Sequence, residues 1–206
     1  MSEESKSAPT GVRQQRKEQT RHELLAAARR VIERRGLAAT TTREIAAEAG
    51  VAAGTFFVHF ADMNLLVETL LDERIGQALQ LGMDTVPASA DLVGQLVHVA
   101  GCLYEGYDDE PDLARQYLAA TLFRSGPHGP AQQRIQQFQD WVTERITEGV
   151  GAEAIPDIDP TLAFTAYFGL YFAFLVAGLR GELERPQQLA LLAASLHRLF
   201  RMEDGA

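Results

Sequence analysis

The stretch TTREIAAEAGVAAGTFFVHF, residues 41–60, holds two short helical patterns that meet at a glycine. Thr42 is expected to cap the first helix, because a hydroxyl can accept a hydrogen bond from a free backbone N–H group. Gly50 suits the tight turn, since glycine readily adopts a positive φ. Val51 and Phe56 then lock the angle between the helices. Two-turn helices are marginal unless neighbours hold them, so the pattern favours a helix-turn-helix over an ordinary antiparallel helix pair.

Helical spacing of apolar residues continues on both sides of this stretch. Residues 16–35 repeat apolar positions every three or four residues, and Gly36 follows as a stop signal. Asp62 is expected to cap the helix that follows. No alternating strand pattern of useful length occurs, so the predicted fold class is all-α. The helices expected after residue 62 span residues 63–83, 90–107, 111–124, 131–149, 159–180 and 186–202.

These patterns predict three segments. Residues 1–12 are polar and small, and we expect them to form a disordered tail. Residues 13–62 form the helix-turn-helix unit, and residues 63–206 form a larger helical body. Hydrophobic residues make up 46% of the 206 residues, which is enough for the packed cores of a globular protein.

The charge of the chain is unevenly distributed. The net charge is −9 at pH 7, yet residues 11–60 carry nine Lys and Arg against five Asp and Glu, a local charge of +4. Residues 61–206 carry nine Arg against 21 Asp and Glu, a local charge of −12. This asymmetry favours a polyanionic partner for the first segment. A basic, solvated helix face is the alternative explanation.

The residues also indicate the compartment. A single cysteine, Cys102, excludes an internal disulfide and a zinc cage of several thiolates. No apolar leader follows Met1, and we therefore expect a cytoplasmic protein. Residues 162–179 carry no charge over a length at the threshold for a membrane span. Their two tyrosines, threonine and two glycines make them only mildly apolar, so we expect a buried helix and no membrane contact.

No group of residues in the sequence forms a catalytic constellation. The five histidines are scattered singly and lack metal-ligand spacing. Neither a Gly-rich phosphate loop nor a G-x-S-x-G elbow occurs. Cys102 is chemically able to act as a nucleophile, but a small buried hydrophobe is the more common role of such a residue. We expect no enzymatic activity, no metal and no cofactor. The histidines are His22, His59, His98, His128 and His197.

Residues 43–66, REIAAEAGVAAGTFFVHFADMNLL, resemble the TetR (tetracycline-repressor-like) family of bacterial one-component regulators. The close resemblance covers residues 16–75, and beyond them it concerns only length and helical character. Its most specific part is the run from Gly54 to Phe60. The resemblance implies a homodimeric repressor that binds a near-palindromic operator in double-stranded DNA. It also implies release of that operator when a small hydrophobic effector enters the helical body.

The resemblance and the local chemistry suggest which residues contact DNA. Thr41 and Thr42 begin a helix whose hydroxyls and free N–H groups favour a phosphate. Arg43 matches a position that reaches a guanine edge in some relatives, and the alternative is a solvated arginine that pairs with Glu44 or another neighbour. His59 matches a phosphate-adjacent histidine of the family, and packing in the three-helix core is the other interpretation. The remaining candidates are the recognition-helix residues Ala53, Gly54, Thr55 and Phe57 and the basic residues Arg16, Lys17 and Arg21.

Two positions depart from the family pattern. Members usually carry a tyrosine at the place of Phe57 and a lysine near Met63, and both contact phosphates there. Phe57 can press on a thymine methyl group but donates no hydrogen bond. We therefore expect DNA affinity to depend on the basic residues near the N-terminus, with sequence read partly through DNA shape. These basic residues are Arg13, Arg16, Lys17 and Arg21.

Helices 159–180 and 186–202 are expected to form the dimer interface, as the last two helices do in the family. The later helix has an apolar stripe, and the earlier one has a stripe of small residues that permits close backbone approach. The alternative is that both stripes pack within one subunit. The apolar stripe comprises Leu189, Leu192, Ala193, Leu196, Leu199 and Phe200, and the small stripe comprises Ala166, Gly169, Ala173 and Ala177.

The helical body carries many aromatic side chains with a few polar tips. Such a set suits an apolar ligand cavity, although ordinary core packing is its more common role. The acidic excess permits a cationic effector, although a solvated acidic surface is the more common explanation. A second class of function stays open: a soluble carrier or sensor of hydrophobic molecules without DNA function. The candidate ligand residues are His98, Cys102, Tyr104, Phe123, Trp141, Tyr167, Phe168 and Tyr171.

Overall fold

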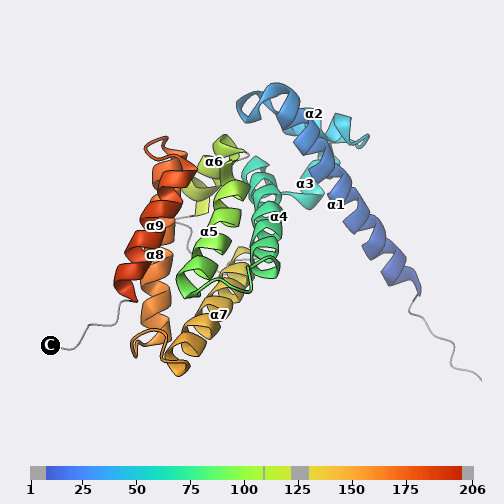
Figure 1. The fold of residues 1–206 in the computed structure, drawn as a ribbon. Coiled ribbons are helices and arrows are strands. Elements are labelled where there is room, and N and C mark those ends of the chain that lie inside the picture. The colour runs from blue at the N-terminus through green and yellow to red at the C-terminus, as the bar shows by residue number, and fades with distance from the viewer. Residues whose placement is uncertain (1–7, 109, 122–129, 201–206) are drawn as a thin grey trace, which may run out of the picture. The chain divides into compact units, whose positions relative to one another are not determined.

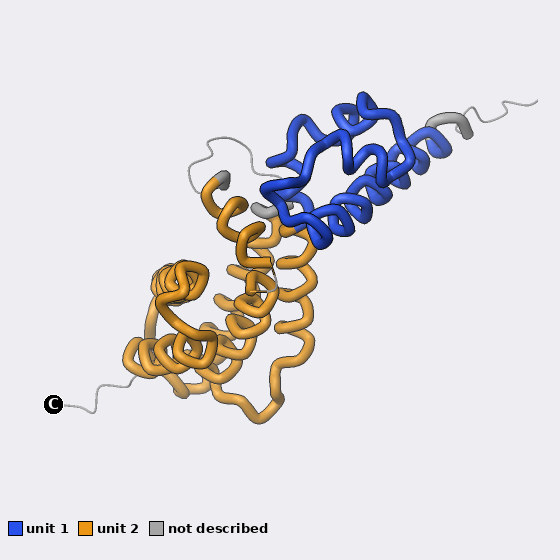
Figure 2. The backbone as a smooth tube through the Cα atoms, turned by 90° about the horizontal axis from the view of Figure 1, so that it is seen from above, with its two compact units in different colours: residues 1–70 blue, residues 71–206 orange. Residues whose placement is uncertain are grey.

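The computed structural model describes residues 8–108, 110–121 and 130–200. All regular elements in these ranges are helices, which confirms the all-α fold class. Figure 1 shows the order of the helices along the chain, which divides into two compact units, residues 1–70 and 71–206 (Figure 2). The division falls inside α4 (Met63–Asp84), whereas the sequence predicted a boundary at residue 62. Leu66 and Leu70 in the first turns of α4 are buried, which explains why these turns belong to the N-terminal unit.

The N-terminal unit is a set of helices around a small apolar core. It contains α1 (Ala8–Arg35), the short 3-10 helix η1 (Leu37–Ala39), α2 (Thr42–Glu48), α3 (Ala53–His59) and the start of α4. Helix α1 packs against η1 and α2, and α2 packs against α3. The core residues are all fully or almost fully buried: Leu24, Leu25, Ala28, Val31, Ile45, Phe56, Phe60 and Leu66.

Helix α1 begins at Ala8, earlier than the start at Arg16 that the apolar spacing predicts. The expected tail over residues 1–12 is therefore wrong for residues 8–12, and residues 1–7 lie outside the described residues. The early turns are exposed over residues 11–19 and have no apolar face that a periodicity would reveal. Side-chain bonds four residues apart support them, from Gln14 to Glu18 and from Gln19 to Glu23, both at 2.8 Å.

The second unit contains the later turns of α4 together with α5 (Leu92–Asp108), α6 (Pro111–Thr121), α7 (Pro130–Gly151), α8 (Pro160–Leu179) and α9 (Arg185–Leu199). Helix α5 is central, because it packs against each of α6, α7, α8 and α9. Its buried side is almost continuous. The side chains that fill the core include Leu96, Val99, Leu103, Tyr104, Phe138, Val142, Ile146, Tyr167, Tyr171, Leu192 and Leu196.

The apolar stripe of α9 serves the core of its own subunit. Leu192, Leu196 and Phe200 are buried, and α9 packs against α5 and α8 of the same chain. Leu192, Leu196 and Phe200 are therefore covered by their own chain, whereas Leu189, Ala193 and Leu199 are only partly buried, and the dimer interface expected at these two helices stays a prediction. The apolar spacing could not distinguish the two outcomes, because a stripe on a helix is equally well covered by its own chain or by a partner.

The small stripe of α8 also differs from its expected role. Gly169 and Ala173 are exposed, and a Cβ atom added at Gly169 would meet nothing within 4 Å. Close approach between α8 and α9 occurs instead at Gly178, where an added Cβ would run into the amide of Gln188. The small residues at positions 169 and 173 consequently lie on an outer face of α8.

Among the described residues, α8 is the helix that is long and apolar enough to cross a membrane. Its most apolar 18 residues have a mean hydropathy of 1.9, and 33% of them are buried. One side of α8 nevertheless lies in the core of the unit. The hydroxyl of Tyr167 donates to the Leu96 carbonyl of α5 at 2.9 Å, and Tyr171 is also buried. These contacts are those of a helix packed within a protein.

Candidate nucleic-acid interface

Helix α2 begins with a capping box. The Thr41 hydroxyl accepts a hydrogen bond from the Glu44 backbone N–H at 3.2 Å, and the Glu44 carboxylate accepts one from the Thr41 backbone N–H at 3.1 Å. The N-cap is therefore Thr41, whereas the sequence predicted Thr42. The threonine three residues before a glutamate is the better cap, because it satisfies two backbone donors reciprocally. The Thr41 hydroxyl, a predicted phosphate ligand, is engaged in this cap.

The turn between α2 and α3 follows the predicted geometry. Gly50 has a φ of 69°, and the Val51 backbone N–H donates to the Ala46 carbonyl at 2.9 Å. This pairing satisfies a carbonyl at the end of α2 that would otherwise lack a partner. Ile45 and Phe56 are completely buried and hold the two helices together. The helix-turn-helix is thus fixed by a left-handed glycine and by apolar contacts on both of its helices.

Helix α3 turns an unusually apolar side toward solvent. Phe57 is 58% exposed and Val58 is 68% exposed, whereas the preceding Phe56 is fully buried. Ala53 and Gly54 are exposed, and Thr55 is half-buried. Exposing large apolar groups on a short helix is unfavourable in water, so a covered state is expected for this surface. The predicted recognition residues therefore lie where a DNA groove could reach them.

Several arginines of α1 are engaged with α2. Arg30 and Arg34 each lie 2.7 Å from the Glu48 carboxylate, and Arg35 pairs with Glu44. Hydrogen bonds from Arg34 and Arg30 lower the pKa of Glu48 to about 2. These ion pairs join α1 to α2. They also neutralise part of the positive charge of α1, which reduces its attraction for an anionic partner.

Other basic residues of the unit stay exposed. Arg13, Arg16 and Lys17 lie on the exposed early turns of α1, and Arg43 is exposed on α2. Because Glu44 pairs with Arg35, the expected alternative of an Arg43–Glu44 pair does not occur. Within the described residues, Arg43 has no ion-pair partner. Its guanidinium is therefore accessible to an external acceptor.

Arg21 has a different environment from the other predicted DNA contacts. Its guanidinium donates to the backbone carbonyl of His59 at 3.0 Å and to the Thr69 hydroxyl at 3.2 Å. The same group lies over the Phe60 ring, 4.4 Å from the ring centroid. Arg21 is half-buried and joins α1 to the end of α3 and to α4. The prediction that Arg21 faces DNA does not agree with these internal contacts.

His59 lies at the last turn of α3 and is half-buried. Desolvation lowers the pKa of His59, and the positive charges of Lys17 and Arg21 lower it further. The ring is therefore mostly neutral at pH 7 when no anion is near. Its Nδ1 atom is buried and has no hydrogen-bond partner among the residues that the structure describes.

Three of the predicted ligand residues, Tyr104, Tyr167 and Tyr171, are buried in the core of the second unit. Tyr104 and Tyr167 are completely buried, and the Tyr104 hydroxyl donates to the Tyr171 carbonyl at 2.9 Å. The Tyr104 and Tyr171 rings stack with centroids 5.3 Å apart. Phe168 is half-buried on α8 and stacks on Phe164. These rings pack against one another, and their predicted contact with a ligand stays a prediction.

The other predicted ligand residues lie apart from this aromatic core. His98 is half-buried, and its Nε2 atom lies 2.9 Å from the Thr85 hydroxyl. Cys102 is a free, half-buried thiol whose pKa is raised by desolvation and by the charge of Glu105. Phe123 lies outside the described residues. Within those residues, no group of three or more His, Cys, Asp or Glu is arranged to hold a metal ion.

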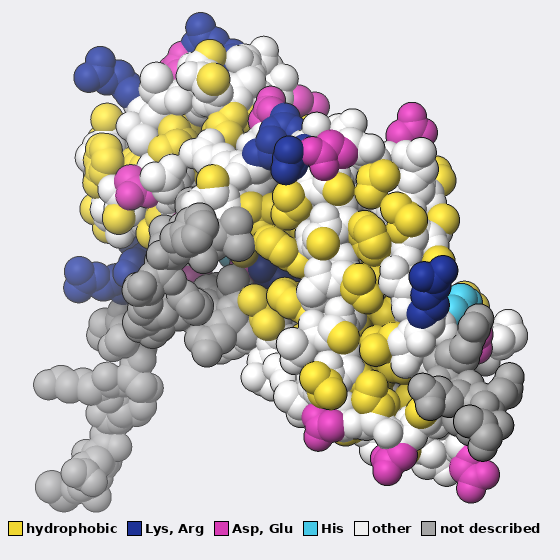
Figure 3. Space-filling model, turned by 90° about the vertical axis from the view of Figure 1, so that its left-hand side faces the viewer, with side chains coloured by type: hydrophobic (Ala, Val, Ile, Leu, Met, Phe, Trp, Pro, Cys, Tyr) yellow, Lys and Arg dark blue, Asp and Glu magenta, His cyan; other side chains and the backbone are white. Residues whose placement is uncertain are grey.

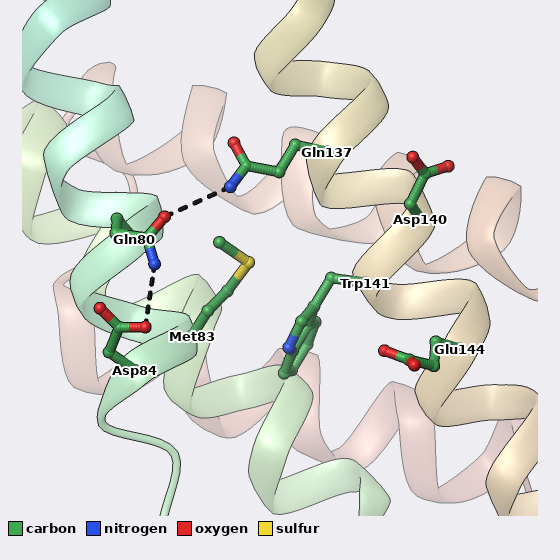
Figure 4. A pocket seen from close by; sticks show the side chains of 7 residues that line it. All are labelled: Gln80, Met83, Asp84, Gln137, Asp140, Trp141 and Glu144. Atoms are coloured by element: carbon green, nitrogen blue, oxygen red, sulfur yellow. Dashed lines mark hydrogen bonds between the residues drawn. The ribbon is translucent and has the colours of Figure 1, made fainter.

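A groove of about 580 Å³ lies between the end of α4 and the middle of α7 (Figure 4). Trp141 is the single predicted ligand residue that lines it. The other lining residues could not be predicted from the sequence, because their proximity depends on how two helices far apart in the chain pack. The complete set is Gln80, Met83, Asp84, Gln137, Asp140, Trp141 and Glu144.

Comparison with known proteins identifies the N-terminal unit. Residues 24–70 match the family model for bacterial regulatory proteins of the tetR family. An uncharacterized HTH-type transcriptional regulator of Bacillus subtilis is 32% identical over 96 residues, which cover 47% of this chain and 49% of that protein. A regulator of the same description from Mycobacterium tuberculosis is 27% identical over 167 residues, which cover 81% of this chain and 74% of that one. The chain thus spans about half the length of the Bacillus protein that it matches.

The whole chain is similar in fold to solved structures of regulators. The crystal structure of RolR in complex with resorcinol aligns with a TM-score of 0.68 and 18% identity, covering 92% of this chain and 91% of that one. At this identity the likeness concerns the fold alone. The family match covers the helix-turn-helix, and the fold likeness extends over the second unit. Over residues 24–70 the chain is therefore similar to bacterial regulatory proteins of the tetR family, and over most of its length it shares the fold of RolR.

Proposed function

We propose that this protein is a homodimeric repressor that binds a near-palindromic operator through α2 and α3 and dissociates when a small molecule binds the second unit. The observation that carries the proposal is the exposed surface of α3, where Phe57 and Val58 face solvent beside accessible basic residues of α1 and α2. A short helix fits a DNA major groove when one of its sides is exposed and the other packs against the rest of the unit.

The exposed residues divide by chemistry into two kinds of DNA contact. Arg43 has a free planar guanidinium suited to a guanine edge, and Phe57 suits a thymine methyl group. Arg16 and Lys17 on the early turns of α1 supply charge for phosphates, which adds affinity without reading sequence. Arg21 is excluded from this set by its internal contacts.

An outer face of α8 and α9 supplies the dimer interface of the proposal. Leu162 is 62% exposed and Leu191 is 43% exposed, and Gly169 and Ala173 also lie on the outside of α8. Figure 3 shows hydrophobic side chains gathered over the side of the second unit that carries these helices. Two such faces related by a two-fold axis bury one another and place two α3 helices on one operator.

A small-molecule effector completes the proposal. RolR, which shares this fold, was solved in complex with resorcinol. Helix α4 runs without interruption from the second unit into the first, so a shift of its later turns on ligand binding reaches the helix-turn-helix. We place the protein in the cytoplasm, where its DNA partner is.

The test is a polarisation titration of the full-length protein with a duplex selected from random DNA and with the promoter of its own gene. Affinity for the selected duplex is expected to fall by about a hundredfold or more between 50 mM and 200 mM salt. Arg43→Ala is expected to lower specific affinity by about tenfold, because it removes a bidentate base contact.

Arg180→Ala is the matched control, since Arg180 is an exposed arginine that pairs with Glu182 in the second unit. Its affinity for the duplex is expected to equal that of the wild type. A carrier of hydrophobic molecules without DNA function would select no duplex and show no salt-dependent binding. Either of those results contradicts the repressor.

A further inference from the structure

We propose that the groove between α4 and α7 is a binding site for a small organic cation with an apolar body. The inference rests on the proposed function only where it makes this cation the effector, since binding in the groove stands on its own. It names a ligand class that the fold likeness does not supply.

The floor of the groove is apolar. Met83 on α4 and Trp141 on α7 are half-buried and point into the space between the two helices (Figure 4). Trp141 follows the buried Phe138 and precedes the buried Val142, so it lies at the border of the core stripe of α7. A large ring and a thioether left partly open to water give an apolar ligand surface on which to pack.

The rim of the groove is acidic. Asp84, Asp140 and Glu144 line it. Two of these carboxylates accept hydrogen bonds from neutral amides: Gln80 donates to Asp84 at 2.9 Å, and Gln136 donates to Asp140 at 2.8 Å. Within the part of the chain that the structure describes, no lysine or arginine pairs with either aspartate. Two uncompensated carboxylates beside an apolar floor favour a positive ligand and repel an anion.

The third carboxylate and the ring already bind a cation of the protein. Arg145 lies 3.0 Å from Glu144, and its guanidinium carbon is 6.0 Å from the centre of the Trp141 ring. The face of an indole ring attracts a cation electrostatically. The groove therefore combines the two groups that recognise organic cations in proteins, which are carboxylates and an aromatic face.

The size of the groove limits the ligand. A volume of about 580 Å³ is within the range of small-molecule sites and exceeds what a metal ion needs. An uncharged hydrophobic molecule would leave the carboxylates of the rim partly desolvated, which costs free energy. An amine or a guanidine attached to an aromatic or alkyl body satisfies both the rim and the floor.

The experiment uses the fluorescence of Trp141, because the chain has one tryptophan. The full-length protein is titrated at pH 7 with phenylbutylamine and with phenylbutanol, which carries a hydroxyl in place of the ammonium group. The amine is expected to change the emission of Trp141 with a Kd of about 100 µM, a usual value for a ligand of this size. The alcohol is expected to bind at least about tenfold more weakly, because it gains no charge interaction.

Two variants test the rim. Asp84→Asn combined with Asp140→Asn keeps the shape of the groove and is expected to weaken amine binding by about tenfold. Asp157→Asn is the matched control, since Asp157 is exposed in the same unit and does not line the groove. Its Kd is expected to be that of the wild type. Thermal unfolding of each variant shows that the unit remains folded.

Equal affinity for the amine and the alcohol would overturn the proposal. So would a loss of amine affinity in Asp157→Asn as large as the loss in the Asp84→Asn, Asp140→Asn variant. The absence of any change in Trp141 emission at millimolar amine would also overturn it. The DNA titration is a separate measurement. Amine binding without any loss of DNA affinity would leave the site in place and remove the cation as effector, whereas a failure to bind DNA at all would contradict the repressor alone.

Discussion

Arg21 shows how the partners of one side chain decide its role. Its guanidinium donates to the His59 carbonyl in the last turn of α3, where the helix dipole leaves partial negative charge. It also lies over the Phe60 ring and donates to Thr69. The planar guanidinium of arginine makes these contacts at the same time, whereas the single compact ammonium group of a lysine cannot. We therefore expect Arg21 to position the end of α3 and not to contact phosphate.

Substitution of Arg21 is expected to lower specific DNA affinity through the position of α3. Both Arg21→Ala and Arg21→Lys should lower affinity for the selected duplex by about tenfold and the free energy of unfolding by about 1–2 kcal/mol. The slope of log affinity against log salt should stay at the wild-type value, because no phosphate contact is lost. Polarisation titrations at several salt concentrations and thermal unfolding provide the measurements.

Arg16 is the matched control on the same helix, since it is exposed and the described residues offer it no ion-pair partner. Arg16→Lys should keep wild-type affinity, and Arg16→Ala should reduce the salt slope by about one. If Arg21→Lys behaved like the wild type in both stability and affinity, Arg21 would be a phosphate contact and our interpretation would be wrong.

At the level of helix pairs, the junction of α8 and α9 depends on a close approach. The Gln188 amide is buried against α8 and donates to the Phe174 carbonyl at 2.7 Å. Gly178 leaves room for this amide, because an added Cβ would collide with it. Gly181 has a φ of 74° and ends α8, so the chain turns directly into α9. The outer face proposed for dimerisation depends on this junction.

Gly178→Ala is expected to destabilise the protein by about 1–3 kcal/mol, although alanine normally favours a helix, since the new Cβ forces a buried amide from its partner. Gly76→Ala in α4 is the control, because an added Cβ there meets nothing within 4 Å. That variant should gain about 0.5–1 kcal/mol. Denaturant unfolding monitored by circular dichroism compares them, and a stabilised Gly178→Ala would show that the contact is unimportant.

The molecule as a whole is proposed to function as a pair of chains. The faces of α8 and α9 that carry Leu162, Ala173 and Leu191 are exposed in a single chain. Linking two helix-turn-helix units makes binding of the second half-site intramolecular and raises operator affinity. A change that separates the chains should therefore weaken DNA binding without altering the N-terminal unit.

Ala173→Arg is expected to give a folded monomer at about 10 µM protein, because a buried unpaired charge at a two-fold interface is counted twice. Operator affinity should fall by about a hundredfold. Light scattering after size exclusion measures the mass, and Gln77→Arg, at an exposed position of α4, is the control that should stay dimeric. A wild-type mass for Ala173→Arg would move the interface elsewhere.

Local signals were sufficient for the all-α class and for the helix-turn-helix. Gly50, the apolar residues around it and the threonines before α2 act over a few residues, so their effect can be read directly from their order. The early turns of α1 could not be predicted in this way, because they are exposed and have no repeating apolar positions.

Contacts between residues far apart in the chain required the folded molecule. Arg21 is 38 residues from the carbonyl that it binds, and the groove combines α4 with α7. Which side of α9 lies inside and which aromatic rings fill the core also depended on these contacts. Spacing along a helix tells which residues share a face, but only packing determines what covers that face, because the hydrophobic effect has no direction.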